Sequence, residues 1–179
     1  MQNLTRLICV FGLLLSVMSA ESLDEWRKKA EAGDAIAQHR LGVKYFLGND
    51  VPKDYEEALK WYRKSADQGN ALAQFSLGGM YQTGEGLPKD YAEAVKWYRK
   101  SADQGNAFAQ VSLGGMYFLG EGVPKDLVQA HVWLNLAGAA GNESAKKGLA
   151  IFEKQMTPDQ IAEAMKLARE LFAKLPKKK

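Results

Sequence analysis

A repeat with a period of 36 residues runs through most of this 179-residue chain. The residues that recur at this spacing include Trp61, Trp97 and Trp133, Gly69, Gly105 and Gly141, and Pro52, Pro88 and Pro124. Two full units, Asp54–Lys89 and Asp90–Lys125, align without gaps and differ at only seven positions; a partial unit, Asp34–Lys53, precedes them, and a divergent one, Asp126–Gly141, follows. A fixed period of this length predicts a solenoid, in which each unit packs against its neighbours.

Each unit is expected to form two helices. Asp54 is a suitable N-cap residue, and Glu57 follows at the spacing of a capping box. That helix should end near Gly69, because glycine readily takes the left-handed conformation that follows many helices. Asn70 should cap the second helix, and the segment 84–88 closes the unit with a turn that ends in proline. No segment of the sequence predicts a strand, so the chain is expected to be an all-α superhelix.

Glycines at two places in the unit have separate roles. Gly78 follows Leu77 inside the second helix, at a propensity cost of about 1 kcal/mol, and should allow the partner helix to approach closely. Gly86 and Gly122 occupy the closing turns, where the first unit has Asp50. If this turn needs a positive φ, aspartate tolerates it less well than glycine.

These motifs resemble the Sel-one-like repeat (SLR) family, a relative of the tetratricopeptide repeat. The resemblance covers about residues 34–153 and rests on this pattern in one unit and the next: Ala73, Leu77-Gly78, Tyr81, Gly84, Gly86, Pro88, Asp90, Ala94, Trp97, Ala102 and Gly105. It implies a protein-binding adaptor rather than an enzyme. A cysteine-rich branch of the family is associated with penicillin binding and hydrolysis, but this chain has one cysteine, Cys9, within its first twenty residues.

In the related repeats, the first helix of each pair lines a concave groove. By this resemblance, the residues expected to face a partner are Ile36, His39, Phe46, Leu72, Phe75, Gln82, Phe108, Val111 and Phe118. A further groove row consists of Leu47, Thr83 and Leu119, and four of the seven differences between the two full units, at 72, 75, 82 and 83, fall on groove positions. We therefore expect an apolar groove that holds a peptide or a segment of another protein.

Other interpretations of these apolar positions remain open. The side chains could pack against neighbouring units or be covered by the ends of the chain, since apolar helix faces are usually core. The protein could also be a regulatory or assembly factor of the cell envelope. A penicillin-recognising hydrolase is a further alternative, because Ser144 and Lys147 match a Ser-x-x-Lys motif. Its companion motifs are absent from the sequence, which favours coincidence.

The sequence shows no pattern typical of catalysis, metal binding or a cofactor. Its two histidines, His39 and His131, lie far apart and at no spacing suited to a metal. The formal net charge of +3 is small, and the final three lysines account for it, so nucleic acid is not an expected partner. We expect a monomer whose partners are proteins or peptides.

Both ends of the repeat array should be capped. Val132, Asn135 and Leu136 stand where the two full units have exposed cations, so a further element must cover them. The candidate is a helix in residues 154–179, which also hold a basic tail; Thr157 begins it, and its apolar stripe is expected to be Ile161, Met165, Ala168, Phe172 and Leu175. At the other end, residues 21–33 with Trp26 should form a helix that covers the first unit.

Residues 1–20 have the layout of a secretory signal peptide. Arg6 precedes an uncharged apolar run, Leu7 to Met18, and small residues follow it. The run is short for a transmembrane helix, which needs about 20 apolar residues. We therefore expect a periplasmic or secreted protein with no membrane span after cleavage. The alternative is an uncleaved N-terminal segment that anchors the protein to the membrane.

Overall fold

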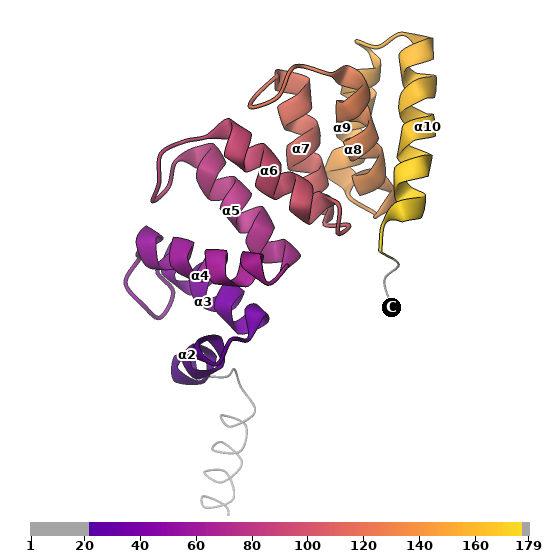
Figure 1. The fold of residues 1–179 in the computed structure, drawn as a ribbon. Helices are drawn as coiled ribbons and strands as arrows, with labels where there is room; N and C mark the ends of the chain where they lie inside the picture. Colours follow the sequence, from indigo (N-terminus) through magenta and orange to yellow (C-terminus); the bar gives the residue numbers. More distant parts are fainter. Residues whose placement is uncertain (1–21, 177–179) are drawn as a thin grey trace, which may run out of the picture.

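The computed structural model describes residues 22–176, and this part of the chain forms nine helices and no strand (Figure 1). The helices are α2 (Leu23–Glu31), α3 (Ala35–Leu47), α4 (Tyr55–Asp67), α5 (Ala71–Thr83), α6 (Tyr91–Ala102), α7 (Ala107–Leu119), α8 (Leu127–Ala139), α9 (Glu143–Glu153) and α10 (Pro158–Lys174). The prediction of an all-α solenoid is confirmed. The predicted signal peptide and the three terminal lysines lie outside the described residues.

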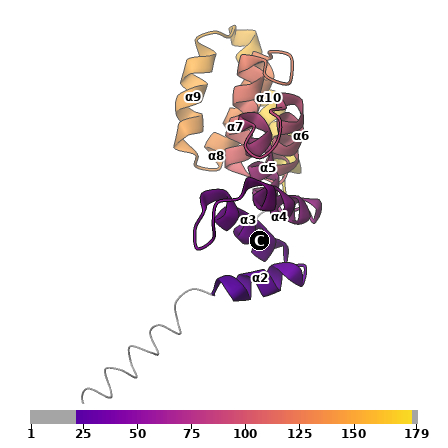
Figure 2. The ribbon, with the colours of Figure 1, turned by 90° about the vertical axis from the view of Figure 1, so that its left-hand side faces the viewer.

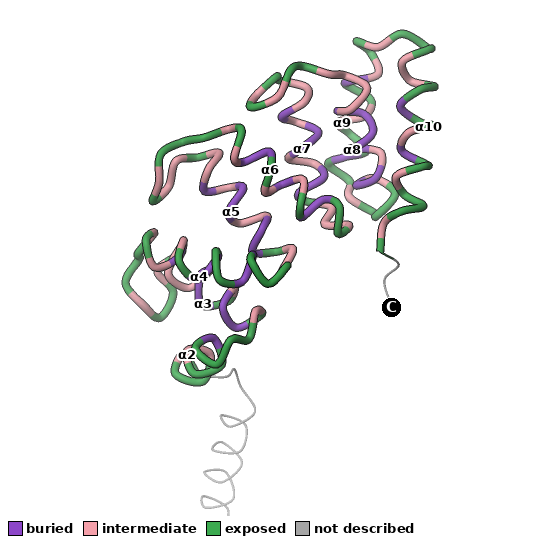
Figure 3. The backbone as a smooth tube through the Cα atoms, viewed as in Figure 1, coloured by how far each residue is buried: buried purple, intermediate pink, exposed green. Residues whose placement is uncertain are grey.

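Consecutive helices pack against each other from α2 to α9, and α10 packs on α8. Figure 1 shows them following an arc, with the helix axes turning gradually between the pair α3–α4 and the pair α7–α8. Buried residues lie where successive helices face each other, while the turns and much of α2 are exposed (Figure 3). The core is therefore a series of linked clusters rather than one central cluster, as expected for a repeat protein.

The predicted caps form, although the capping box at Asp54 is only half present. The Asp54 side chain accepts hydrogen bonds from the backbone N–H groups of Glu56 and Glu57, both at 3.0 Å. The reciprocal bond is missing because the backbone N–H of Asp54 donates to Tyr45 O at 2.9 Å. The Glu57 carboxylate instead accepts from Trp61 Nε1 at 3.1 Å, so this glutamate fixes the tryptophan rather than the cap.

The closing turns have the backbone conformation that the sequence suggested. Gly86 and Gly122 have φ angles of 75° and 69°, and Asp50 has a φ of 64°. Asp50 is the one described non-glycine residue with a positive φ. Its carboxylate pairs with Lys44 Nζ, which offsets part of the strain of this conformation.

Helix α2 packs against α3 at the start of the array. Ser22 and Glu25 form a complete capping box at its start, with bonds of 2.8 Å and 3.3 Å. Leu23 and Trp26 pack onto a cluster that α2, α3 and α4 share. The Arg40 guanidinium lies 4.4 Å from the centre of the Trp26 ring and covers it from the solvent side.

At the other end α10 packs against α8, and Figure 2 shows α9 and α10 on opposite sides of α8. Val132 and Leu136 are buried there, in a cluster that includes Ala164 and Ala168 of α10. The predicted stripe on α10 is partly wrong, because Met165 and Phe172 are 46% and 59% exposed. The face that packs on the array consists of Ala164, Leu167, Ala168, Leu171 and Leu175. The two alanines are buried completely or nearly so, and their small size lets α10 lie close to α8.

Candidate binding face

The nine residues predicted to contact a partner lie on the odd-numbered helices α3, α5 and α7, and we call this surface the odd-helix face. Its first row consists of Ile36, Leu72 and Phe108, each in the first turn of its helix. These side chains are 59%, 52% and 64% exposed. A large apolar side chain therefore stands open to solvent at the same place in three successive units.

The second row, His39, Phe75 and Val111, is half-buried. The Phe75 ring lies 5.7 Å from the ring of Tyr98 on α6 and 6.1 Å from that of Phe108 on α7. The two phenylalanines therefore form a continuous apolar surface across α5 and α7.

The third row, Phe46, Gln82 and Phe118, is largely occupied by contacts within the chain. Phe46 packs edge-on against Tyr55 at 5.3 Å, and Gln82 Oε1 accepts a hydrogen bond from the Tyr98 hydroxyl at 2.7 Å. Phe118 stacks on Phe152 of α9, with ring centres 4.1 Å apart and planes within 3°. Phe118 is therefore covered from one side by the chain itself.

A hollow of about 270 Å³ opens between α3 and α5 on this face. Phe46 and Phe75 are its apolar walls, and Tyr62, Ser76 and Gly79 also line it. The Ser76 hydroxyl lies 3.3 Å from His39 Nε2 of α3, so a polar contact joins the two helices at the hollow. The hollow is thus mainly apolar with a few polar atoms, which is the usual make-up of a small binding site.

Two titratable side chains at this hollow, His39 and Tyr62, are neutral at physiological pH, and the Glu85 carboxylate also lines it. Burial, and to a smaller extent the charge of Arg40, lowers the pKa of His39. Burial raises the pKa of Tyr62 to about 12, against a smaller opposing effect from its hydrogen bond with Ser76. The phenylalanine and tyrosine walls therefore favour an apolar group, and the Glu85 carboxylate disfavours an anion.

Helix α9 extends the odd-helix face by one unit, and the sequence analysis did not include it. Residues 36 positions after the first two rows are Ser144 and Lys147, both exposed, and Ile151, one turn further along, is 56% exposed. Lys154, which ends the helix, is exposed as well. The 36-residue period could have identified these residues from the sequence. Counting 36 positions on from α7 leads into α9, although the residue types there differ from those of the earlier units.

The hydrolase alternative gains no support from the geometry. Ser144 and Lys147 are both exposed near the start of α9, and neither lines the hollow between α3 and α5. Within residues 22–176 no group of His, Cys, Asp and Glu residues could hold a metal ion. Among the same residues no helix is long and apolar enough to cross a membrane.

Comparison with known proteins identifies the repeat. The profile described as Sel1 repeat matches three consecutive segments, residues 35–70, 71–106 and 107–142. The chain belongs to the Sel1 repeat family. Each matched Sel1 segment begins with an odd-numbered helix and ends in the turn before the next one. Sel1 repeats generally mediate interactions between proteins, and the family fold is generally non-catalytic.

Two solved structures share both the Sel1 architecture and part of the sequence. A Sel1 repeat protein from Oxalobacter formigenes is 40% identical, with a TM-score of 0.66, over 72% of this chain and 96% of its own. The protein c5321, a protective antigen of uropathogenic Escherichia coli, displays an SLR fold and is 31% identical with a TM-score of 0.58. That match covers 89% of this chain and 43% of c5321.

One curated relative is also similar in sequence. It is the secretory immunoglobulin A-binding protein EsiB of Escherichia coli O6:H1, strain CFT073, which is 40% identical over 51 residues. The match covers 28% of this chain and 10% of EsiB, so this chain spans only a small part of that larger Sel1 protein.

Proposed function

We propose that this protein is a binding module whose odd-helix face holds an apolar segment of a partner protein. The observation that carries the proposal is the row Ile36, Leu72 and Phe108, in which each side chain is more than half exposed in three successive units. Exposed apolar side chains that recur at one place in successive units are typical of a protein-interaction surface. The row belongs to the part of the unit that changes from repeat to repeat, while the buried scaffold is nearly constant.

The segment that fits this face has apolar side chains along most of its length and an acidic group at one end. Phe75 and Phe108 offer aromatic surface in the middle of the face. Lys147 and Lys154 of α9 are exposed at one end of it, where they would attract a carboxylate. Binding of this kind joins apolar burial, which supplies affinity, to charge complementarity, which sets the direction of the segment.

We also propose that the protein acts in the periplasm or outside the cell. The support is the sequence of residues 1–20, with its positive start, its apolar run and the small residues after it. The names of two relatives, a protective antigen and a secretory immunoglobulin A-binding protein, are consistent with such a location.

A pair of double variants tests the binding proposal. Leu72→Asp with Phe108→Asp places two charges on the exposed row, where substitutions should disturb folding little. Lys60→Asp with Lys96→Asp places the same two aspartates on the exposed surface of α4 and α6, at the cost of two weak surface ion pairs.

Each tagged protein is used to retain partners from an envelope extract of the source bacterium, and its folding is checked by circular dichroism. We expect the variant of the odd-helix face to lose the specifically retained partner while the α4–α6 variant keeps it. Equal retention by both variants would contradict the proposal.

A further inference from the structure

Two glutamines link each unit of the array to the next, and we call this arrangement the glutamine ladder. Gln38 Nε2 donates to Ala30 O at 3.0 Å, and Gln38 Oε1 accepts from Gln68 Nε2 at 2.7 Å. One unit later Gln74 makes the same two bonds, to Ala66 O at 3.2 Å and from Gln104 Nε2 at 2.7 Å. In Gln38 and Gln74, both the nitrogen and the oxygen of the side-chain amide thus have a hydrogen-bond partner.

The ladder is incomplete in the third unit. Gln110 Nε2 still donates to Ala102 O at 3.2 Å. The partner position for its oxygen, 36 residues after Gln104, holds Ala140. Gln110 is 1% exposed, and its Oε1 is buried without a hydrogen-bond partner. Such an unsatisfied buried acceptor costs about 1–3 kcal/mol, so this departure from the repeat needs an explanation.

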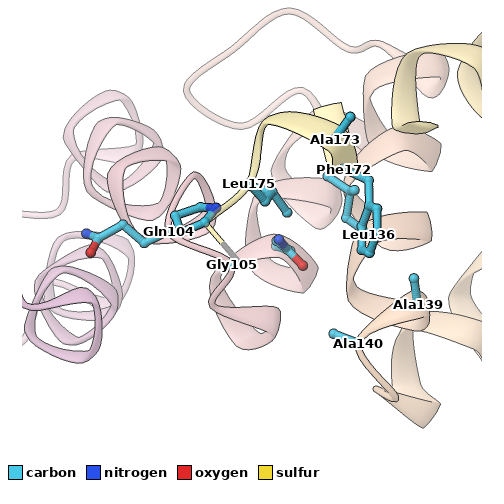
Figure 4. Close-up of a pocket in the computed structure, with 10 residues that line it drawn as sticks. Gln104, Gly105, Leu136, Ala139, Ala140, Phe172, Ala173 and Leu175 are labelled. Atoms are coloured by element: carbon cyan, nitrogen blue, oxygen red, sulfur yellow. The ribbon is translucent and has the colours of Figure 1, made fainter. Parts of the chain in front are cut away.

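A hollow of about 290 Å³ lies at this place, between the end of α8, the turn after α6 and the last turn of α10 (Figure 4). It exists because small or apolar residues replace the long polar ones of the earlier units: Leu136 stands for Lys100, Ala139 for Asp103 and Ala140 for Gln104. Gln110 is part of its lining, and Phe172 and Leu175 of α10 form its other side.

We propose that this hollow binds an aromatic group of one or two rings that carries one N–H or O–H donor, such as an indole. The ring would lie among Leu136, Phe172 and Leu175, and its donor would bond to Gln110 Oε1 in place of the absent glutamine once the Gln110 side chain turns this buried oxygen toward the hollow. A dry apolar cavity of about 150 Å³ can hold benzene, so a hollow of this volume has room for a two-ring group.

The lining also argues against a charged ligand. None of the residues that form it carries a charge, and an ion would lose its hydration without a counter-charge in return. Phe172, 59% exposed at the rim, also lines a neighbouring hollow of about 230 Å³. Its exposure is unfavourable in the free protein and would be relieved by an aromatic ring lying against it.

The inference is tested by nuclear magnetic resonance titration of the purified protein with indole and with N-methylindole. The two molecules have nearly the same apolar surface, but only indole has an N–H donor. We expect indole to shift signals of residues around Ala140 and Phe172 and to saturate. N-methylindole should bind roughly tenfold more weakly, because it leaves the Gln110 oxygen unsatisfied.

Two variants separate the roles of space and donor. Ala140→Gln restores the ladder and fills the hollow, so it should abolish indole binding and leave the protein at least as stable. Gln110→Met removes the acceptor at similar size, so indole and N-methylindole should then bind equally. A second titration with N-acetyltryptophanamide distinguishes a protein side chain, which it mimics, from a free small aromatic molecule as the natural source of the ring.

The result that would overturn the inference is an absence of indole binding, or indole binding that is unchanged in Ala140→Gln. Indole binding that appears only after deletion of Lys177–Lys179 would also overturn it, since the tail of the chain would then be the natural occupant. The proposal is independent of the odd-helix face, because none of the residues involved belongs to that face.

Discussion

Gly78 and Tyr98 are in direct contact, with the tyrosine ring pressed against the helix backbone. A Cβ atom placed on Gly78 would lie 2.5 Å from Tyr98 Cδ1, far inside contact distance. Tyr98 is buried, and its hydroxyl donates to Gln82 Oε1. The spacing between α5 and α6 is therefore set by the absence of a side chain at residue 78, and Gly42 has the same relationship with Tyr62.

The first prediction concerns the adjacent glycines of α5. Gly78→Ala should destabilise the protein by about 1–2 kcal/mol, because overpacking of the tyrosine outweighs the better helix propensity of alanine. Gly79→Ala is the matched control, since only the Tyr98 hydroxyl lies near its Cβ, at 3.8 Å. We expect that variant to be neutral or stabilised by up to about 1 kcal/mol. Urea denaturation measures both, and equal effects of the two changes would contradict this account of the helix contact.

The second prediction compares equivalent closing turns. Gly86→Asp should cost more than about 2 kcal/mol, because a Cβ there would lie 2.6 Å from Tyr55 Cβ in addition to the strain of a φ of 75°. Asp50→Gly should stabilise the protein by less than about 1 kcal/mol, since relief of strain is partly offset by loss of the Lys44 pair. Thermal unfolding of both variants checks the opposite signs.

The third prediction concerns the complete part of the glutamine ladder. Gln68→Ala leaves Gln38 Oε1 without its donor, and we expect a loss of about 1–3 kcal/mol. The exposed Gln155 provides the control, because its replacement by alanine removes no described side-chain hydrogen bond and should change stability by less than about 0.5 kcal/mol. Chemical denaturation of the two variants should therefore give clearly different midpoints.

The fourth prediction is that the stability of the protein depends on pH through the protonation of His39. Burial lowers the pKa of His39 in the folded protein, so the unfolded chain takes up this proton at a higher pH than the folded chain does. This contribution to stability is complete above the unfolded pKa of about 6.5 and is lost as the pH falls through the lower folded pKa. We expect His39→Gln to lose less stability than the wild type between pH 7.5 and pH 5. Parallel slopes for the two proteins would show that His39 is not responsible.

Much of the fold follows from the period, because a repeat fixes helices, caps and turns at once. Asn70 caps α5 and Gly84 ends it with a φ of 80°, as expected from their spacing. The rotation of α10 could not be obtained in the same way. Its apolar residues allow more than one stripe, and the choice depends on how closely Ala164 and Ala168 can approach α8.

The sequence predicts which helices carry the candidate site, but it does not predict which of the site's side chains are accessible to a partner. The period places all nine predicted residues on α3, α5 and α7. It does not show that Phe118 is covered by Phe152, since the positions equivalent to residue 152 in the earlier units hold Lys44, Met80 and Met116. The unsatisfied oxygen of Gln110 also needed the structure, because the two glutamine contacts join residues 30 positions apart.

Photocrosslinking in living cells tests the central claim most directly. A photoreactive residue is placed at Leu72 or Phe108 on the odd-helix face. The control position is Lys96, which is also exposed and lies in the same repeat array, but on α6. The account predicts that the same partner is captured from positions 72 and 108 and not from 96, and that the purified partner then binds the purified protein. Capture of that partner from position 96 alone, or equally from all three positions, would contradict it.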